Sequence, residues 1–237
     1  IEFGPDSAYG PEIYNTHRLR WFDKWLKNID NRVELDPAVR IFVMGGGNGR
    51  KNSDGKLNHG GIWRTESEWP IARTKHVEYY LRSDGRLSPE PPGLDEPALS
   101  YIHDPAGPVP TIASSITALS RLAELPPSIG YVPPRNRIQP LVINGGAHQA
   151  ESPEHFASSP PYIELRERED VLVFQSDLLA EDVEITGSIL VTLWVSSNAI
   201  DTDFTAKLLD IYPPTDDYPS GYHLNLADSV IRTRYRN

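Results

Sequence analysis

Proline placement is the sequence feature that most limits how this chain can fold. The stretch from Ser88 to Pro161 holds most of the 22 prolines, in runs such as PEPPG, DPAGPVP and YVPPRN. Proline has no backbone N–H to donate, so long strand ladders cannot form there. A long irregular span inside a compact domain usually wraps a surface or covers a site. We therefore expect regular structure to lie before and after this stretch.

Composition excludes several classes of function. The 237 residues include no cysteine, which removes disulfides, thiolate metal sites and cysteine nucleophiles. The formal net charge of -10 repels polyanions, so we expect no nucleic-acid partner. No apolar run is long enough to span a bilayer and no signal-peptide pattern is present, so we expect no membrane partner and interpret the chain as soluble.

The first predicted element is an amphipathic helix over residues 11–28, which begins at Pro11, a residue that suits a first helical turn. Apolar residues recur there at three- and four-residue steps, and charged residues fill the other side. Such a pattern predicts that the apolar side packs on a domain core. We call this side the aromatic stripe, and it consists of Tyr14, Trp21, Phe22, Trp25, Leu26 and Ile29.

A strand over residues 39–44 is predicted next, and it runs into the glycine-rich sequence MGGGNGR. A phosphate-binding loop would have to open a helix whose N-terminal amides face the anion. The residues that follow are turn formers without a helical period. We therefore interpret the glycines as positions that need a positive φ.

The remaining β signals lie outside the proline-rich stretch. Residues 76–85 predict a short strand closed by a turn, and a second β-rich block begins at residue 171. Within this block, residues 189–195 alternate as a strand that is apolar on one side, and residues 222–235 predict a strand, a turn and a strand.

The segment DTDFTAKLLD, residues 201–210, predicts a strand whose apolar and polar residues alternate. Phe204, Ala206 and Leu208 would face a core, so that Phe204→Ala would cost roughly 3 to 5 kcal/mol as the truncation of a buried aromatic. Asp203, Thr205 and Lys207 would face away from it. Cross-strand charge pairing is the ordinary use of such a face. Calcium binding by Asp201 and Asp203 is the alternative, although no further acidic ligand lies nearby.

The sequence shows no catalytic constellation. It has no G-x-S-x-G nucleophile elbow and no H-E-x-x-H metal motif. Five of the seven histidines stand in loop-like or strand-edge positions and are interpreted as solvated or hydrogen-bonded surface residues: His59, His76, His103, His148 and His155. We therefore predict no catalytic residue, no cofactor and no metal ligand in this chain.

Several segments, in this order, closely resemble the X-Pro dipeptidyl-peptidase and cocaine-esterase-like acyl hydrolases, the CocE/NonD serine hydrolases. They include RWFDKWLKN, VRIFVMGGGNGR, HGGIWRTESEWPIART, YYLRSDGRLSPEPPG, YIHDPAGPVPT, LADSVIRTRYR and the block from Asp170 to Pro214. The resemblance implies a mainly β fold. It further implies a jelly-roll β-sandwich of the galactose-binding-like type, incomplete at its C-terminus and preceded by the last helix and strand of an α/β-hydrolase domain.

On this resemblance, residues 1–75 are the remnant of the hydrolase domain with a linker, and residues 76–237 are the partial jelly roll. The Ser-Asp-His triad would lie upstream of Ile1, in a parent enzyme that cleaves acyl esters or N-terminal X-Pro peptides. The chain's own upstream hydrolase domain is then the expected partner. Four tryptophans are expected to pack at the domain junction: Trp21, Trp25, Trp63 and Trp69.

Two other functions stay open. A jelly roll can also bind carbohydrate, for which Trp194 or Tyr222 could serve, since fold alone decides no function. A surface for homo-oligomerisation is the second alternative.

The chain also departs from the resemblance, because residues 112–150 are longer than the expected loop and His148 in GGAHQ stands where relatives often carry an aspartate.

Overall fold

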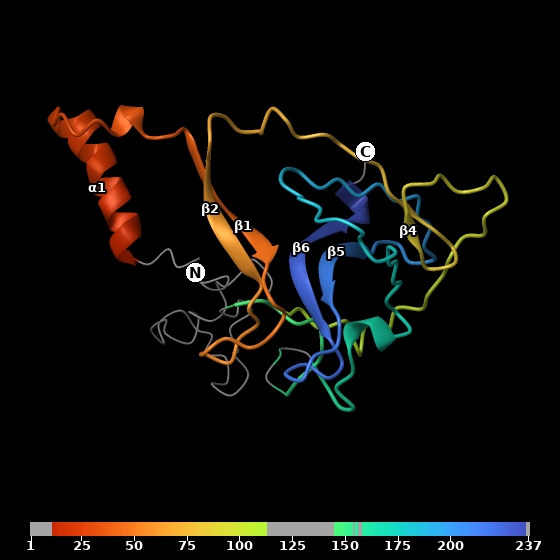
Figure 1. The fold of residues 1–237 in the computed structure, drawn as a ribbon. Coiled ribbons are helices and arrows are strands. Elements are labelled where there is room, and N and C mark those ends of the chain that lie inside the picture. The colour runs from red at the N-terminus through yellow and green to blue at the C-terminus, as the bar shows by residue number, and fades with distance from the viewer. Residues whose placement is uncertain (1–10, 113–144, 154, 156–157, 236–237) are drawn as a thin grey trace, which may run out of the picture.

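The computed structural model describes residues 11–112, 145–153, 155 and 158–235 (Figure 1). Its regular elements are one α-helix, three short 3₁₀ helices and six strands, so the predicted mainly β class is confirmed. They are α1 (Pro11–Lys27), η1 (Val33–Leu35), β1 (Val39–Gly46), β2 (Gly60–Glu66), β3 (Tyr80–Leu81), β4 (Leu87–Ser88), η4 (Leu165–Glu167), β5 (Asp203–Tyr212), β6 (Tyr222–Arg232) and η5 (Thr233–Tyr235).

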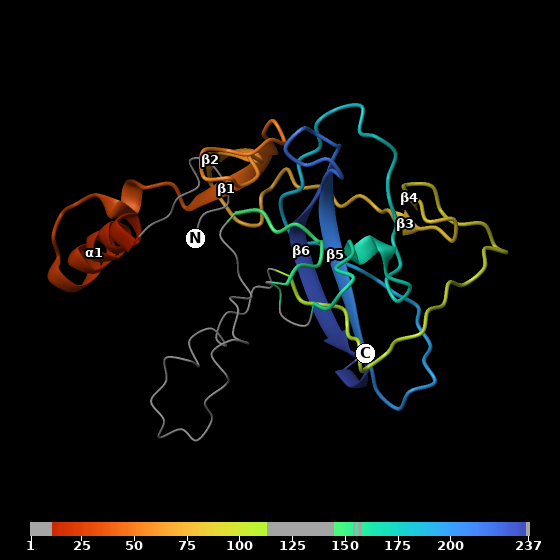
Figure 2. The same cartoon turned by 90° about the horizontal axis from the view of Figure 1, so that it is seen from below.

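The strands form three antiparallel pairs: β1 with β2, β3 with β4, and β5 with β6. Figures 1 and 2 place the β5–β6 pair between the other two. Within the described residues each sheet contains two strands. The finer expectation of a jelly-roll sandwich therefore stays a prediction.

The helix predicted over residues 11–28 is confirmed as α1, but its packing is not as expected. Its charged face reaches the turn that follows it, where Arg20 bonds Asp36 at 2.7 Å and Lys24 bonds Glu34 at 2.8 Å. The aromatic stripe is exposed, and both views show α1 standing apart from the strands. The predicted packing of the stripe on a core is therefore wrong for the described residues, because α1 attaches through its charged face.

Positive φ angles at the glycine-rich end of β1 confirm the conformational reading of these residues. Gly45, Gly46 and Gly49 have φ angles of 119°, 73° and 66°. The loop returns into β2, and no helix opens from it. Gly47 is needed for a different reason, since a Cβ there would lie 2.2 Å from the carbonyl oxygen of Asn58 on the returning chain.

A small hydrophobic core joins the loop between β1 and β2 to the start of β6. Leu57, from the loop between β1 and β2, packs with Tyr222 and Leu224 of β6. The same loop meets the β5–β6 turn, where the backbone N–H of Lys51 donates to Asp217 Oδ2 at 3.0 Å. The partly buried residues around this core are Tyr212, Tyr218 and Leu226.

The strand predicted over residues 201–210 is confirmed as β5, displaced by two residues toward the C-terminus. Phe204, Ala206 and Leu208 lie on one face as expected, but they are only half-buried.

Because Phe204 is half-buried, we expect Phe204→Ala to lower the free energy of unfolding by about 1 to 2 kcal/mol, below the range for a fully buried aromatic. Urea denaturation of the full chain measures this change. Thr205→Ala, on the exposed face of the same strand, is the control and should change stability by less than about 0.5 kcal/mol. Equal losses of stability in the two variants would contradict the placement of Phe204 on the more buried face of β5 and of Thr205 on the exposed face.

Two other strand predictions fail. Residues 189–195 form no strand, and the side chains of Ile189, Leu190 and Trp194 are all exposed. Alternation alone cannot make a strand, because a ladder needs a neighbour and none of the described residues supplies one. Residues 222–235 form one continuous strand ending in η5, where a strand, a turn and a strand were predicted.

The short strand and turn predicted at residues 76–85 are confirmed as β3 and the turn that leads to β4. Most of the predicted 112–150 insertion, residues 113–144, lies outside the described residues.

Candidate functional site

Histidine and tyrosine rings gather where residues 145–151 meet the start of β6. His148 stacks on Tyr222 with ring centroids 4.5 Å apart, and it meets the ring of His223 edge-on at 5.6 Å. Tyr218 packs against Tyr222 at 4.8 Å. The Tyr222 hydroxyl donates a hydrogen bond of 2.6 Å to the carbonyl of Gly146. We call this group the histidine–tyrosine cluster.

Burial sets the protonation states in the cluster. Desolvation lowers the pKa of His148 and of His223, and it raises the pKa of Tyr222. The carboxylate of Glu164 lies 3.6 Å from His223 Nδ1 and opposes this effect. All three rings are therefore neutral near pH 7.

The surface interpretation of the five histidines holds for His76 and His103, which are exposed. It is wrong for His59, which immediately precedes β2, is fully buried, and has no hydrogen-bond partner for its two ring nitrogens among the described residues. Burial lowers the pKa of His59, so this ring is neutral as well. His148 and His155 are half-buried, and His155 Nδ1 lies 3.1 Å from the carbonyl of Ala150.

The contacts of these rings favour a structural role. His148 Nδ1 accepts from the backbone of His223, and His155 contacts a backbone carbonyl. None of these contacts is with a serine hydroxyl, which a histidine base would need to activate. The absence of catalytic residues from this chain stays a prediction.

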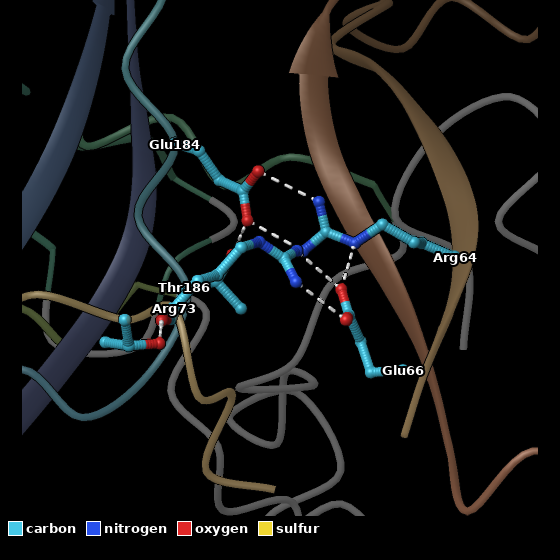
Figure 3. Close-up of polar contacts among 6 residues, drawn as sticks. Arg64, Glu66, Arg73, Glu184 and Thr186 are labelled. Carbon is cyan, nitrogen blue, oxygen red and sulfur yellow. Dashed lines mark hydrogen bonds and ion pairs between the residues drawn. The ribbon is translucent and has the colours of Figure 1, made fainter. Parts of the chain in front are cut away.

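A second polar site joins β2 to a distant loop (Figure 3). Arg64 holds Glu184 through two hydrogen bonds of 2.9 and 2.7 Å, although the two residues are 120 positions apart. Arg64 Nε also lies 2.6 Å from Glu66, and Glu66 is held in turn by Arg73. The Thr186 hydroxyl donates to Glu184 at 2.9 Å. Charges of opposite sign thus alternate along the network from Arg73 to Glu184.

Glu184→Gln tests this network. Hydrogen bonds from Arg64 and from Thr186 lower the pKa of Glu184 from 4.5 to about 2. Because the folded-state pKa is lowered, the stabilisation is present above about pH 4.5 and is lost as the pH falls toward 2. Because 44 % of the Glu184 side chain is exposed, solvent screens its interactions. We therefore expect Glu184→Gln to lower the free energy of unfolding at pH 7 by less than about 1 kcal/mol.

Urea denaturation at pH 7 and pH 3 measures how the difference between variant and parent chain changes with pH. The difference should shrink at the lower pH. Asp216→Asn is the control, because its side chain is 93 % exposed and lies 3.8 Å from Arg50. If the stability difference between Glu184→Gln and the parent chain stays constant with pH, then Glu184 is not held ionised by Arg64 and Thr186.

The carboxylates of the DTD sequence are paired with arginines. Asp203 bonds Arg232 across the β5–β6 ladder at 2.8 Å, and Asp201 pairs with Arg234. The predicted use of this face for cross-strand charge pairing is thereby confirmed. The calcium alternative is not supported, because arginines occupy both carboxylates and the described residues contain no cluster of three metal-ligating side chains.

The tryptophans do not gather in one place. Trp21 and Trp25 touch each other on α1, Trp63 packs edge-on against Phe42 of β1, and Trp69 follows β2. Trp21, Trp25 and Trp69 are more than half exposed. Their packing against a further domain stays a prediction.

The two aromatics considered for sugar binding differ sharply in exposure. Trp194 is 98 % exposed, whereas Tyr222 is only 7 % exposed and belongs to the core. Tyr222 is therefore excluded as a platform for a sugar ring.

The described helices include none with the length and apolar character needed to cross a bilayer.

The fold and its polar contacts define a mainly β domain, and comparison with known proteins shows the family to which this domain belongs. A family model described as the X-Pro dipeptidyl-peptidase C-terminal non-catalytic domain matches residues 31–237, so the chain belongs to this family. This match and the relatives below confirm the resemblance to the X-Pro dipeptidyl-peptidase and cocaine-esterase-like hydrolases.

The first of these relatives is the cocaine esterase of a Rhodococcus species, which is 29 % identical over 99 % of this chain and 33 % of its own length. Two proteins proposed to be serine esterases, from Mycobacterium bovis and Mycobacterium tuberculosis, are each 24 % identical over 88 % of this chain and 25 % of their own length. The chain thus spans a third or less of these relatives. No solved structure matches it.

Proposed function

We propose that this chain is the C-terminal accessory part of a serine hydrolase that cleaves acyl esters or N-terminal X-Pro peptides. The observation that carries the proposal is the match of residues 31–237 to a non-catalytic domain family. The relatives support it, because cocaine esterase is about three times as long as the aligned region. In the parent enzyme, a serine upstream of Ile1 attacks the carbonyl carbon, a histidine takes its proton, and an oxyanion hole stabilises the tetrahedral intermediate.

In this proposal the upstream hydrolase domain is the partner of α1. The exposed aromatic stripe supports that assignment, because an exposed apolar patch of this kind marks an interaction surface. The β pairs then belong to a galactose-binding-like jelly roll. The boundary between the two units is proposed at residues 75 and 76, although the family match begins at residue 31 and so includes β1 and β2.

Labelling with a fluorophosphonate tests the proposal, because this reagent modifies only an activated serine. Intact mass is measured for this chain and for its full-length parent. The proposal expects the parent to gain one label and this chain to gain none. A label on this chain would overturn the non-catalytic assignment, and an unlabelled parent would overturn the serine hydrolase itself.

Substrate class requires a separate measurement on the unlabelled, active parent. Hydrolysis of an X-Pro p-nitroanilide is compared with hydrolysis of a p-nitrophenyl acyl ester. A preference for the anilide assigns a dipeptidyl-peptidase, and a preference for the ester assigns an acyl esterase. Hydrolysis of neither substrate would contradict both assignments.

Carbohydrate binding is the second candidate function, and the exposure of Trp194 is its one supporting observation. Titration calorimetry with a panel of soluble oligosaccharides tests it. The accessory-domain proposal expects no heat of binding. Binding that disappears in Trp194→Ala would instead favour the carbohydrate module. Light scattering of the parent with and without residues 76–237 tests the oligomerisation alternative in the same preparation.

A further inference from the structure

We propose that the ring of His148 is an acid-sensitive lock that holds residues 145–151 against β6. His148 Nδ1 accepts a hydrogen bond of 3.0 Å from the backbone N–H of His223. This bond lies within an otherwise regular backbone pairing. The N–H of Asn225 donates to the carbonyl of Ala147, also at 3.0 Å, and His148 and Leu224 form an antiparallel bridge.

The amide of His223 depends on the His148 ring, because the pairing leaves it without a backbone acceptor. The N–H of Gln149 donates to the carbonyl of His223 at 3.0 Å. In a regular antiparallel pair the reverse bond would run from His223 to the carbonyl of Gln149. That carbonyl accepts instead from the N–H of Leu165 at 3.0 Å. The imidazole therefore takes the place of a missing backbone carbonyl.

Protonation of His148 removes this acceptor. A neutral imidazole that accepts through Nδ1 carries its proton on Nε2, whereas an imidazolium donates from both nitrogens. A proton on Nδ1 would face the N–H of His223, and two donors cannot bond each other. Because His223 is buried, with 2 % of its surface exposed, water cannot readily replace the lost acceptor.

The surroundings of His148 favour the neutral ring at pH 7. In the described residues, the titratable and charged groups around it are Tyr222 and His223 on β6, His155, Glu164 with its partner Arg166, and Lys56 beside Gly145. Burial is the largest influence and lowers the pKa of His148, whereas the Glu164 carboxylate acts in the opposite direction.

The sign of the pH dependence follows from the lowered pKa. An unfolded histidine takes up a proton near pH 6.5, whereas folded His148 resists protonation until the pH is lower. The lock is therefore fully closed above about pH 6.5 and weakens as the pH falls below it. The bond from Tyr222 to Gly146 does not titrate in this range, so the segment loosens first at the His223 amide.

Hydrogen exchange of the His223 amide, followed by NMR on the ¹⁵N-labelled full chain, tests the lock. Protection factors, corrected for the intrinsic exchange rate at each pH, are compared at pH 7.5 and pH 5. We expect the protection of the His223 amide to fall at least tenfold. The Asn225 amide, which bonds a backbone carbonyl, should lose much less.

His148→Asn is the decisive variant, because its Oδ1 can accept the same bond and does not titrate. We expect its His223 amide to stay protected at both pH values. His76→Asn changes an exposed histidine outside the cluster and should keep the pH dependence of the parent chain. The proposal is overturned if protection in the parent chain does not depend on pH, or if His148→Asn shows the same loss as the parent chain.

Discussion

Leu57→Ala is expected to lower the free energy of unfolding of the full chain by about 2 to 5 kcal/mol, as removal of a fully buried leucine side chain does in other cores. Leu57 is 1 % exposed and packs against Tyr222 and Leu224. The described core is small, so few neighbours can move to fill the space left by the side chain. Urea denaturation followed by circular dichroism measures the change.

Leu94→Ala is the matched control for this substitution. Leu94 is fully exposed in the loop after β4, so the same chemical change removes no buried contact. We expect a loss below about 0.5 kcal/mol. Similar losses at the two positions would show that the loop between β1 and β2 does not pack on β6.

Gly47→Ala is expected to lower stability by about 1 to 3 kcal/mol or more, because the added methyl group has no space. Its carbon would lie 2.2 Å from the Asn58 carbonyl oxygen and 2.4 Å from the Gly60 nitrogen. Both are backbone atoms, so no side chain can rotate away. The two arms of the β1–β2 loop would have to separate, and Leu57 lies in that loop.

Thermal unfolding measures the effect, with each kcal/mol worth a shift of about 2 to 4 °C for a chain of this size. Gly93→Ala is the control, since a methyl group there meets no atom within 4 Å. It should be neutral or slightly stabilising, because alanine restricts the unfolded chain. A Gly47→Ala chain that melts with the Gly93→Ala chain contradicts the close approach.

Sequence periodicity correctly predicted two kinds of element: a helix, which makes its backbone hydrogen bonds within its own segment, and a strand that has a neighbouring strand to pair with. Residues 11–28 repeat at helical steps and form α1, and residues 201–210 alternate and find β6 as a neighbour. Residues 189–195 alternate equally well and form no ladder among the described residues. Local pattern thus predicts the tendency to form a strand, whereas the presence of a partner strand is a property of the fold.

The histidine–tyrosine cluster could not be predicted, because its members meet only through long-range folding. His148 looked like a loop residue among glycines, and Tyr222 looked like an exposed aromatic at the start of a strand. Their contact joins two segments that nothing in the local sequence relates. The signal that sequence did contain was the histidine in place of the expected aspartate in GGAHQ, and the structure shows it accepting a backbone hydrogen bond.

The order in which the core is assembled has a consequence for protein synthesis. The loop that carries Leu57 packs on residues of β6. One of its hydrogen bonds joins Lys51 to Asp217, 166 positions later in the chain. At ordinary elongation rates this separation corresponds to a delay on the order of 10 seconds on the ribosome. During that interval the β1–β2 hairpin has no core to pack on. Translation pauses before residue 222 would therefore prolong its exposure to chaperones and proteases.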